Sequence, residues 1–400
     1  MSAWLSIIGL GEDGLSGLSP VARALIDGAE LIVGGERHLA LIGTTRAERR
    51  TWETPLSATV AAIAAWRGRA VVVLATGDPM WYGVGVTLAR RFPPPESLIL
   101  PQAGAFSLAA ARLGWPLAEV ETLTVHGRSL DLLALHFHPG ARLIILSEDG
   151  TTPAKVAALL AARGWGRSHM TVFAHMGGPT ETRQDGVAAQ WGDRAAADLN
   201  TIAVVCEAES GATIIARTGL PDDVFEHDGQ ITKREVRAVT LAALVPLPGQ
   251  RLWDVGAGSG AVAIEWMRAA RGTHAIAIER DGSRAQRIAR NAAALGVPAL
   301  RIVAGAAPAA LDDLATPDAV FIGGGVADPA IIARCWSVLH AGGRLVANAV
   351  TIEGEAALIA AHRQFGGVLV RLQVARAEPV GGLLGWRPLM PVTQWQATRP

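Results

Sequence analysis

The chain has 400 residues, half of them hydrophobic, which suffices for about two or three domains with buried cores. Acidic and basic residues balance at 36 each, which excludes a large basic surface for nucleic acid and an acidic tail. Only Lys155 and Lys233 are lysines, and the other basic residues are arginines. This bias is typical of a GC-rich genome, although arginine also pairs well with carboxylates and phosphates.

Cysteine usage and the first residues predict a soluble cytoplasmic protein. Cys206 and Cys335 are far apart in the sequence, so we expect neither a disulfide framework nor a cysteine zinc site. The apolar start of the chain lacks basic residues and runs into two acids, which favours a buried strand over a signal peptide. No apolar run is long enough to span a bilayer. The pair His136 and His138 precedes Pro139-Gly140, which indicates a loop, and we expect no metal site.

Strand-like and helix-like segments alternate through the first half of the chain. The run AVVVLA at 70–75 is continuously apolar, as is typical of a parallel strand buried on both faces. The alternation predicts an α/β fold. We expect strands at 4–9, 31–34, 70–75, 143–147 and 202–206, and helices at 20–29 and 153–162.

A second α/β region follows a polar, turn-rich segment at 219–229. We expect helices at 233–244 and 261–269 and strands at 253–255, 275–278, 319–322 and 344–347. The pattern predicts one domain over residues 1–213, a linker over 214–226 and a second domain over 227–400.

A glycine-rich loop from Asp254 to Gly260 lies between a predicted strand and a predicted helix. Glycines at alternate positions let the backbone turn sharply and approach a ligand closely. Glu279 ends the next strand, where a carboxylate can reach the hydroxyls of a ribose. The loop and the acid together predict a nucleotide-type cofactor site; the alternative is a plain turn that packs a helix.

The loop and Glu279 resemble motif I and the ribose-binding acid of class I S-adenosylmethionine-dependent methyltransferases. Segments 230–238, 305–308 and 321–325 narrow this to the cobalamin-pathway enzymes that methylate carbon 15 and decarboxylate the ring C acetate. Ala306 stands where relatives often carry an acid, so only a backbone contact is implied there. The chain lacks the Asn-Pro-Pro-Tyr tetrad of relatives that methylate bases. The resemblance implies a Rossmann-like domain with S-adenosylmethionine bound by Thr232, Gly256, Ala257, Gly258, Ser259, Gly260, Glu279 and Ala306.

Three loops in the first half also follow predicted strands, at 9–14, 76–83 and 101–107. Ligands of open parallel sheets bind at this edge, although each loop alone is compatible with an ordinary turn. The loops resemble those of the tetrapyrrole methylases, except that Glu12 replaces the usual proline. This resemblance implies a fold of two α/β subdomains that binds a second S-adenosylmethionine through Gly9, Gly11, Gly77, Asp78, Pro79, Tyr82 and Ala105.

Segments 34–39, 109–115, 125–128 and 177–181 are similar to the tetrapyrrole methylases that act on carbon 5 of the corrin precursor. Both resemblances in one chain match the family of fused precorrin-6Y methyltransferases (decarboxylating) of aerobic cobalamin biosynthesis. That family implies conversion of precorrin-6Y to precorrin-8X, one S-adenosylmethionine per domain and a homo-oligomer.

Such a substrate carries many carboxylates, which arginine forks bind well. We expect Arg37, Arg112, Arg237 and Arg387 to bind substrate and His126, Arg128 and Lys233 to act in catalysis; for each one, a solvated surface position is the alternative. The nucleophile would be an enamine carbon of the macrocycle, so neither a catalytic triad nor a metal is required.

Two other functions remain open from the sequence. A nicotinamide-dependent reductase would use the C-terminal glycine loop, but the spacing GxGxG counts against it. A corrinoid carrier with a single active domain would explain the departures at Glu12 and Ala306.

Overall fold

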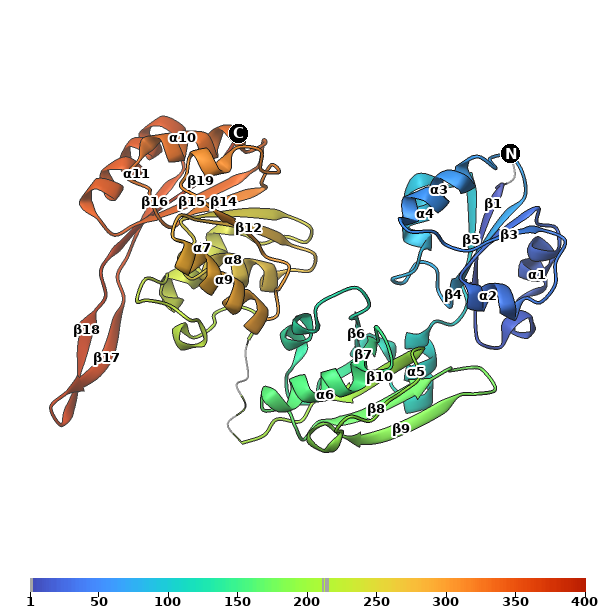
Figure 1. Ribbon diagram of the computed structural model, residues 1–400. Helices are drawn as coiled ribbons and strands as arrows, with labels where there is room; N and C mark the ends of the chain where they lie inside the picture. Colours follow the sequence, from blue (N-terminus) through green and yellow to red (C-terminus); the bar gives the residue numbers. More distant parts are fainter. Residues whose placement is uncertain (1–2, 211, 213–215) are drawn as a thin grey trace. The chain divides into compact units, whose positions relative to one another are not determined.

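The computed structural model describes residues 3–210, 212 and 216–400. They form two compact units (Figure 1). Unit 1 consists of Met1–Leu130 and His136–Thr213, and unit 2 of Asp131–Leu135 and Ile214–Pro400, counting in each case the described residues only. The boundary expected after residue 213 and the start of the expected linker 214–226 lie outside the described residues. Both units alternate strands with helices, which confirms the α/β class.

The first sheet of unit 1 is entirely parallel, with the order β3-β2-β4-β1-β5. Its central strands β4 and β1 are mostly apolar, as expected for strands with helices on both faces. Helices α1 and α2 pack on one face, and α3 and α4 pack on the other. The strands are β1 (Leu5–Leu10), β2 (Leu31–Val33), β3 (Glu48–Arg50), β4 (Val71–Thr76) and β5 (Ser97–Leu100), and the helices are α1 (Pro20–Asp27), α2 (Glu36–Leu41), α3 (Leu56–Ala64) and α4 (Gly85–Arg91).

The second sheet of unit 1 has the order β6-β7-β10-β8-β9 and is mostly antiparallel, with only β6 and β7 parallel. Helix α5 (Ala105–Leu113) places Phe106 and Ala109 against this sheet. The two sheets give unit 1 the two α/β subdomains expected from the sequence. The other elements are α6 (Thr152–Ala162), β6 (Glu121–Thr124), β7 (Arg142–Leu146), β8 (His169–Ala174), β9 (Thr182–Val187) and β10 (Asn200–Val205).

Unit 2 is a doubly wound sheet with the order β13-β12-β11-β14-β15-β19-β16. Its first five strands are parallel, and alternate residues of each strand face opposite helix layers. In β11, Leu252 packs toward α7, α8 and α9, whereas Trp253 packs toward α10 and α11. The strands are β11 (Arg251–Val255), β12 (His274–Glu279), β13 (Arg301–Ala304), β14 (Ala319–Ile322) and β15 (Arg344–Ala349), and the helices are α7 (Arg234–Leu244), α8 (Ala261–Ala269), α9 (Gly282–Ala294), α10 (Pro329–Val338) and α11 (Ile352–Phe365).

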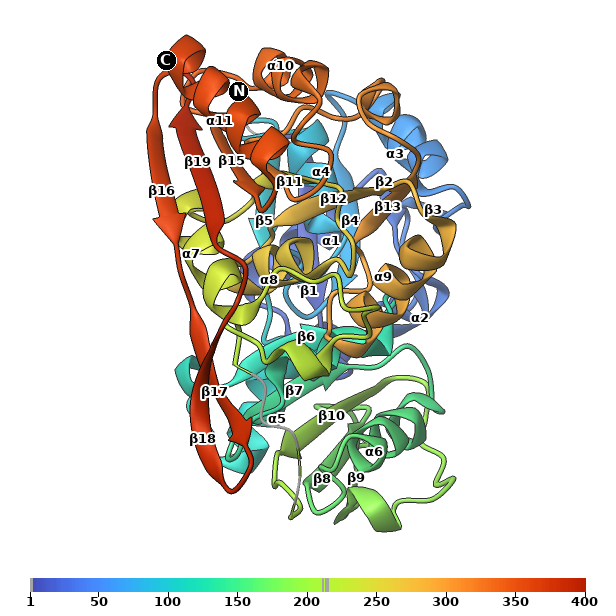
Figure 2. The same ribbon diagram turned by 90° about the vertical axis from the view of Figure 1, so that its left-hand side faces the viewer.

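The C-terminal strand β19 (Val392–Thr398) lies between β15 and β16 (Val368–Leu372) and is antiparallel to both. Between β16 and β19 the chain makes a two-stranded hairpin, β17 (Ala375–Val380) and β18 (Leu383–Pro388). Figure 2 shows this hairpin extending away from the sheet of unit 2. Its side chains are therefore largely exposed, including Leu383 and Trp386.

The segment expected as a linker differs from that expectation in its second half. Leu220 and Phe225 are buried in the core of unit 2, and Asp222–Val224 forms a turn of 3-10 helix. The apolar residues of this polar stretch therefore belong to the domain that follows. None of the helices in the described part of the chain is both long and apolar enough to cross a membrane.

Candidate active sites

The glycine loop of unit 2 connects β11 to α8. Gly256, Gly258 and Gly260 all have a positive φ, between 60° and 77°, which L side chains rarely adopt. At Gly256 the neighbouring chain adds a second constraint, because a Cβ there would lie 2.6 Å from the Cα of Gly324. The loops after β11 and β14 thus touch through glycine backbones, and this leaves the strand ends open to a ligand.

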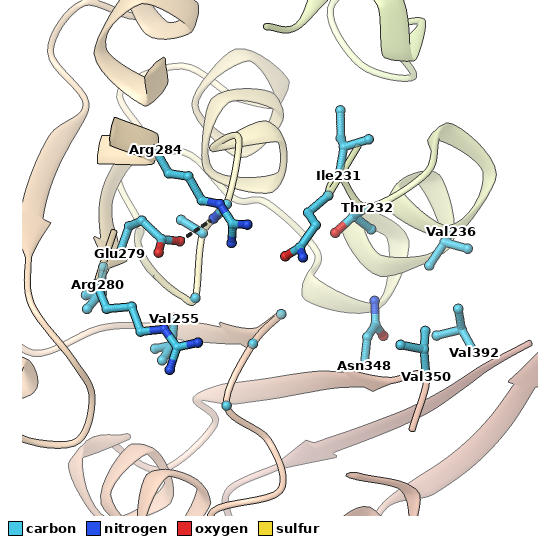
Figure 3. Close-up of a pocket in the computed structure, with 18 of the residues that line it drawn as sticks. Ile231, Thr232, Val236, Val255, Glu279, Arg280, Arg284, Asn348, Val350 and Val392 are labelled. Atoms are coloured by element: carbon cyan, nitrogen blue, oxygen red, sulfur yellow. Dashed lines mark hydrogen bonds between the residues drawn. The ribbon is translucent and has the colours of Figure 1, made fainter. Parts of the chain in front are cut away.

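Glu279 ends β12 beside this loop. Its Oε2 accepts a hydrogen bond from the Gly258 amide at 2.8 Å (Figure 3). Its Oε1 accepts one from the Asp281 amide at 3.0 Å. The residue is 4% exposed. Each carboxylate oxygen has a further lone pair, so Glu279 can accept hydrogen bonds from ribose hydroxyls while it holds the loop. These donors and acceptors fit the adenosine part of S-adenosylmethionine.

A cavity of about 910 Å³ opens at these strand ends. Figure 3 shows Glu279 and Arg280 on one side of it and Asn348 and Val350 on another. The predicted residues that line it are Thr232, Lys233, Gly256, Ala257, Gly258, Glu279 and Ala306. Ser259 and Gly260 do not line it; Ser259 is buried, and Gly260 precedes the first turn of α8.

Asp254 lies in β11, just before the glycine loop, and stabilises the start of the helix that follows the loop. It is fully buried, and its Oδ2 accepts a hydrogen bond from the Ala263 amide in the first turn of α8 at 2.9 Å. Its other oxygen is buried without a partner among the described residues. Burial, together with the nearby charge of Glu279, raises the pKa of Asp254 to about 7. Asp254 therefore fixes the start of the helix and does not reach the cavity.

Two arginines that sequence reasoning did not select line the cavity. Arg284 pairs with Asp228 at 2.9 Å, and this hydrogen bond is the main reason why the pKa of Asp228 lies well below its usual range. Arg280 forms no ion pair with any residue that the structure describes. Arg280 follows Glu279 directly, so its position next to the ribose acid was the signal that could have identified it.

Arg237 was expected to bind substrate, but the structure places it elsewhere. Its side chain is 0% exposed, and its Nε donates to Glu265 at 2.6 Å. The remaining N–H groups donate to Asp222 and to the carbonyls of Leu220 and Thr232, and Phe225 lies against the guanidinium. Because each nitrogen of its guanidinium has a hydrogen-bond partner, Arg237 links α7 to α8 and does not line the cavity. The acidic residue Glu265, in a helix whose only other charged residue is Arg268, was the signal for this buried pair.

In unit 1 the three predicted loops meet at the edge of the parallel sheet. A Cβ on Gly9 would lie 1.8 Å from the Gly77 carbonyl oxygen and 2.7 Å from the Gln102 amide. A Cβ on Gly77 would lie 2.6 Å from Gly104, and its φ is +54°. Only glycine fits at these positions, so the loops after β1, β4 and β5 converge as expected for one site.

A small cavity of about 50 Å³ lies beside these loops. The predicted residues Gly11, Arg37, Gly77 and Ala105 line it, and Glu12 and His175 complete its polar side. Arg37 pairs with Glu12 and donates to Thr76 at 2.7 Å. Gly9, Asp78, Pro79 and Tyr82 are not among its lining residues.

His38 is the neighbour of Arg37. Its Nε2 lies 2.9 Å from the Thr76 hydroxyl and 3.0 Å from the Arg37 guanidinium. Burial, followed by the charge of Arg37, lowers the pKa of His38 to about 4. His38 is therefore neutral near pH 7, and its Nε2 accepts hydrogen bonds.

The other predicted residues lie outside both cavities. Arg112 makes a two-point ion pair with Glu181 at 2.7 and 2.8 Å, which lowers the pKa of that glutamate. Arg128 lies over the ring of Tyr82, and His126 lies 3.5 Å from Glu148. Arg387 pairs with Glu378 on the exposed hairpin. Among the described residues, no three His, Cys, Asp or Glu side chains are grouped to hold a metal ion.

Comparison with known proteins gives two family matches that together span most of the chain. The profile of the Tetrapyrrole (Corrin/Porphyrin) Methylases matches residues 5–190, and that of the Precorrin methyltransferase domain matches residues 223–399. A Sinorhizobium protein named precorrin-6Y C(5,15)-methyltransferase [decarboxylating] is 49% identical over 100% of this chain and 97% of its own length. The chain belongs to the precorrin-6Y C(5,15)-methyltransferase (decarboxylating) family.

Other members of this family show how widely the likeness extends. The Mycobacterium tuberculosis (strain H37Rv) protein of the same name is 44% identical over 98% of this chain and 99% of its own. A crystal structure of the C-terminal domain of precorrin-6Y C5,15-methyltransferase from Rhodobacter capsulatus is 48% identical. It covers 46% of this chain and 100% of that one, with a TM-score of 0.44.

Proposed function

We propose that this chain converts precorrin-6Y into precorrin-8X by methylating carbons 5 and 15 and decarboxylating the ring C acetate. We assign carbon 5 to unit 1 and carbon 15, with the decarboxylation, to unit 2. The observation that carries the proposal is that each unit has its own cavity at the strand ends, bordered by its own converging glycine loops.

One S-adenosylmethionine per unit would supply the methyl group as a sulfonium. In unit 2, the Gly256–Gly258 backbone and Glu279 would hold it, and in unit 1 the loops at Gly77 and Ala105 would do so. The chain itself positions the macrocycle carbon in line with the methyl group, and such positioning contributes about 7–11 kcal/mol. Lys233 and Arg280 are the cations that line the unit 2 cavity without an ion pair among the described residues, and they would bind substrate carboxylates.

We also propose that the chain is a homo-oligomer. The hairpin exposes Val380, Leu383, Leu384 and Trp386 by 66 to 79% of their surface, which is a large apolar surface for an isolated protein. A second copy is the occupant that we assign to it. Light scattering should show that L384E/W386E is smaller than the unmodified chain. A cytoplasmic location and the absence of nucleic-acid and membrane partners stay predictions.

The test counts methyl groups. The full chain is incubated with S-adenosylmethionine and reduced corrin precursor, and the product mass and carbon dioxide are measured. Gly77→Ala should block the unit 1 methylation alone, whereas Gly256→Ala should block the unit 2 methylation and carbon dioxide release. Gly140→Ala and Gly249→Ala are matched controls, because both glycines have a positive φ but a Cβ there meets nothing within 4 Å.

Each outcome separates the candidate functions. Two methyl additions with loss of carbon dioxide support the proposal. One addition in the unmodified chain indicates a carrier with one active unit. No addition, together with binding of NAD(P)H, indicates a reductase.

A further inference from the structure

Glu12 and His175 form a dyad on the polar side of the unit 1 cavity, which Arg37 also lines. Glu12 lies in the loop after β1, and His175 directly follows β8, so the dyad joins the two sheets of unit 1. The Nδ1 of His175 lies 2.9 Å from Oε2 of Glu12. Both residues line the same cavity as Gly77 and Ala105, the residues assigned above to the cofactor.

The hydrogen bonds fix which nitrogen of His175 can take up a proton. Glu12 also forms an ion pair with Arg37, and the carboxylate oxygen that faces Nδ1 of His175 is a hydrogen-bond acceptor. The hydrogen of a neutral His175 is therefore on Nδ1, and Nε2 carries the lone pair. No other side chain among the described residues pairs with His175, whose side chain is 32% exposed.

The backbone at His175 is held in an unusual conformation. Its φ is +51°, in the left-handed region that residues other than glycine adopt rarely because of steric strain. A Cβ at Gly178, three residues on, would lie 2.7 Å from the Glu12 Cβ, so the turn after β8 approaches Glu12 closely. The strained backbone of this turn thus places the imidazole of His175 beside Glu12.

The proposed reaction needs a base at this point. When the bridge carbon forms its bond to the methyl group, the pair of the S–C bond stays on sulfur, and the ring becomes a cation. The bridge carbon then carries both hydrogen and methyl. Conjugation returns only when the C–H bond breaks, its pair returns to the ring and the proton goes to a base. The thioether that leaves and the methylated ring do not themselves take up that proton.

We propose that the Glu12–His175 dyad is the base of unit 1, with Nε2 of His175 as the acceptor of the proton from the methylated bridge carbon. Histidine suits the role because it exchanges a proton near neutral pH, and an anionic partner on Nδ1 stabilises the imidazolium that forms. His38 does not suit it, because Arg37 and Thr76 already occupy its Nε2. This inference rests on the proposed function.

The test uses the full chain with substrate carrying deuterium or hydrogen at the bridge carbon that unit 1 methylates. His175→Ala should slow formation of the unit 1 product about 100-fold or more. Breaking of the C–H bond then limits the rate, so a primary isotope effect should appear that the unmodified chain lacks. Added imidazole should restore part of the rate, and carbon dioxide release by unit 2 should not change.

Two further variants complete the design. Glu12→Gln keeps an acceptor for Nδ1 but removes the charge, so it should slow the same step less and show the same isotope effect, even if His175→Ala does not fold. His169→Asn alters an exposed histidine at the start of β8, the strand that precedes His175, and should have no effect.

An unchanged rate in His175→Ala would overturn the inference. So would a slow variant with no isotope effect, no rescue by imidazole and weaker binding of S-adenosylmethionine in calorimetry, because that pattern belongs to a residue that only shapes the cleft. Failure of the proposed function looks different: the unmodified chain then adds one methyl group or none.

Discussion

Replacing Arg237 by methionine tests the buried ion-pair network of unit 2. The change removes the partner of Glu265, which is 0% exposed, and leaves the Leu220 and Thr232 carbonyls without this donor. Glu265 keeps the amides of Gly219 and Leu220, at 2.6 and 3.0 Å, which limits the loss. Breaking a buried pair by removing one partner costs about 3–5 kcal/mol.

For a unit of this size, that loss corresponds to a fall in Tm of about 6 to 20 °C. Calorimetry of the full chain should show the unit 2 transition moving down while the unit 1 transition stays in place. Arg234→Met is the matched control: Arg234 is exposed one turn earlier on α7, and its substitution should change the free energy of unfolding by less than about 0.5 kcal/mol.

Arg237 does not stabilise unit 2 through this pair if Arg237→Met unfolds at the same temperature as Arg234→Met. A second refuting result is a variant of normal stability that has lost its affinity for the corrin substrate. Arg237 would then be a substrate ligand, as its place in the sequence motif first indicated.

Three further predictions concern unit 2. Glu279→Gln should weaken S-adenosylmethionine binding to unit 2 about 10- to 100-fold in calorimetry, because one charged acceptor is lost, and an unchanged Kd would remove Glu279 from the site. Arg280→Gln should raise the KM for the corrin substrate about 5-fold in the carbon dioxide assay and leave cofactor affinity unchanged. The pKa of Asp254 is about 7 in the folded chain, so the folded state binds an extra proton between about pH 4 and 7. The free energy of unfolding of unit 2 should therefore fall by about 4 kcal/mol as pH rises through that window. Asp254→Asn should flatten this dependence in denaturant titrations at several pH values, and an unchanged slope would contradict the assignment.

The features that could be predicted from sequence are those dictated by local chemistry. Glycines at Gly77 and Gly256 are required by positive φ and close backbone contacts, and this requirement is visible as a motif. A continuous apolar run such as 70–75, which covers most of β4, indicates a strand buried on both faces. The ribose acid Glu279 was found because strand and loop lie close together in the sequence.

The features that could not be predicted depend on contacts between distant residues. Arg237 is occupied by Glu265 on another helix, so its motif alone could not show that it is buried. The dyad joins positions 12 and 175, and only the turn after β8 brings them together. The antiparallel β19 has no local signal for its place between β15 and β16.

The place of β19 has a consequence for how the chain tolerates cleavage. The hairpin turns at Gly381 and Gly382, which are exposed in a single copy of the chain, as is typical of sites where proteases nick a folded chain. A cut there would divide unit 2 into two covalent pieces. Because β19 pairs with β15 on one side and β16 on the other, the pieces stay joined by backbone hydrogen bonds along both edges of the strand. The nicked chain would run as two fragments on a denaturing gel and as one particle in a native column.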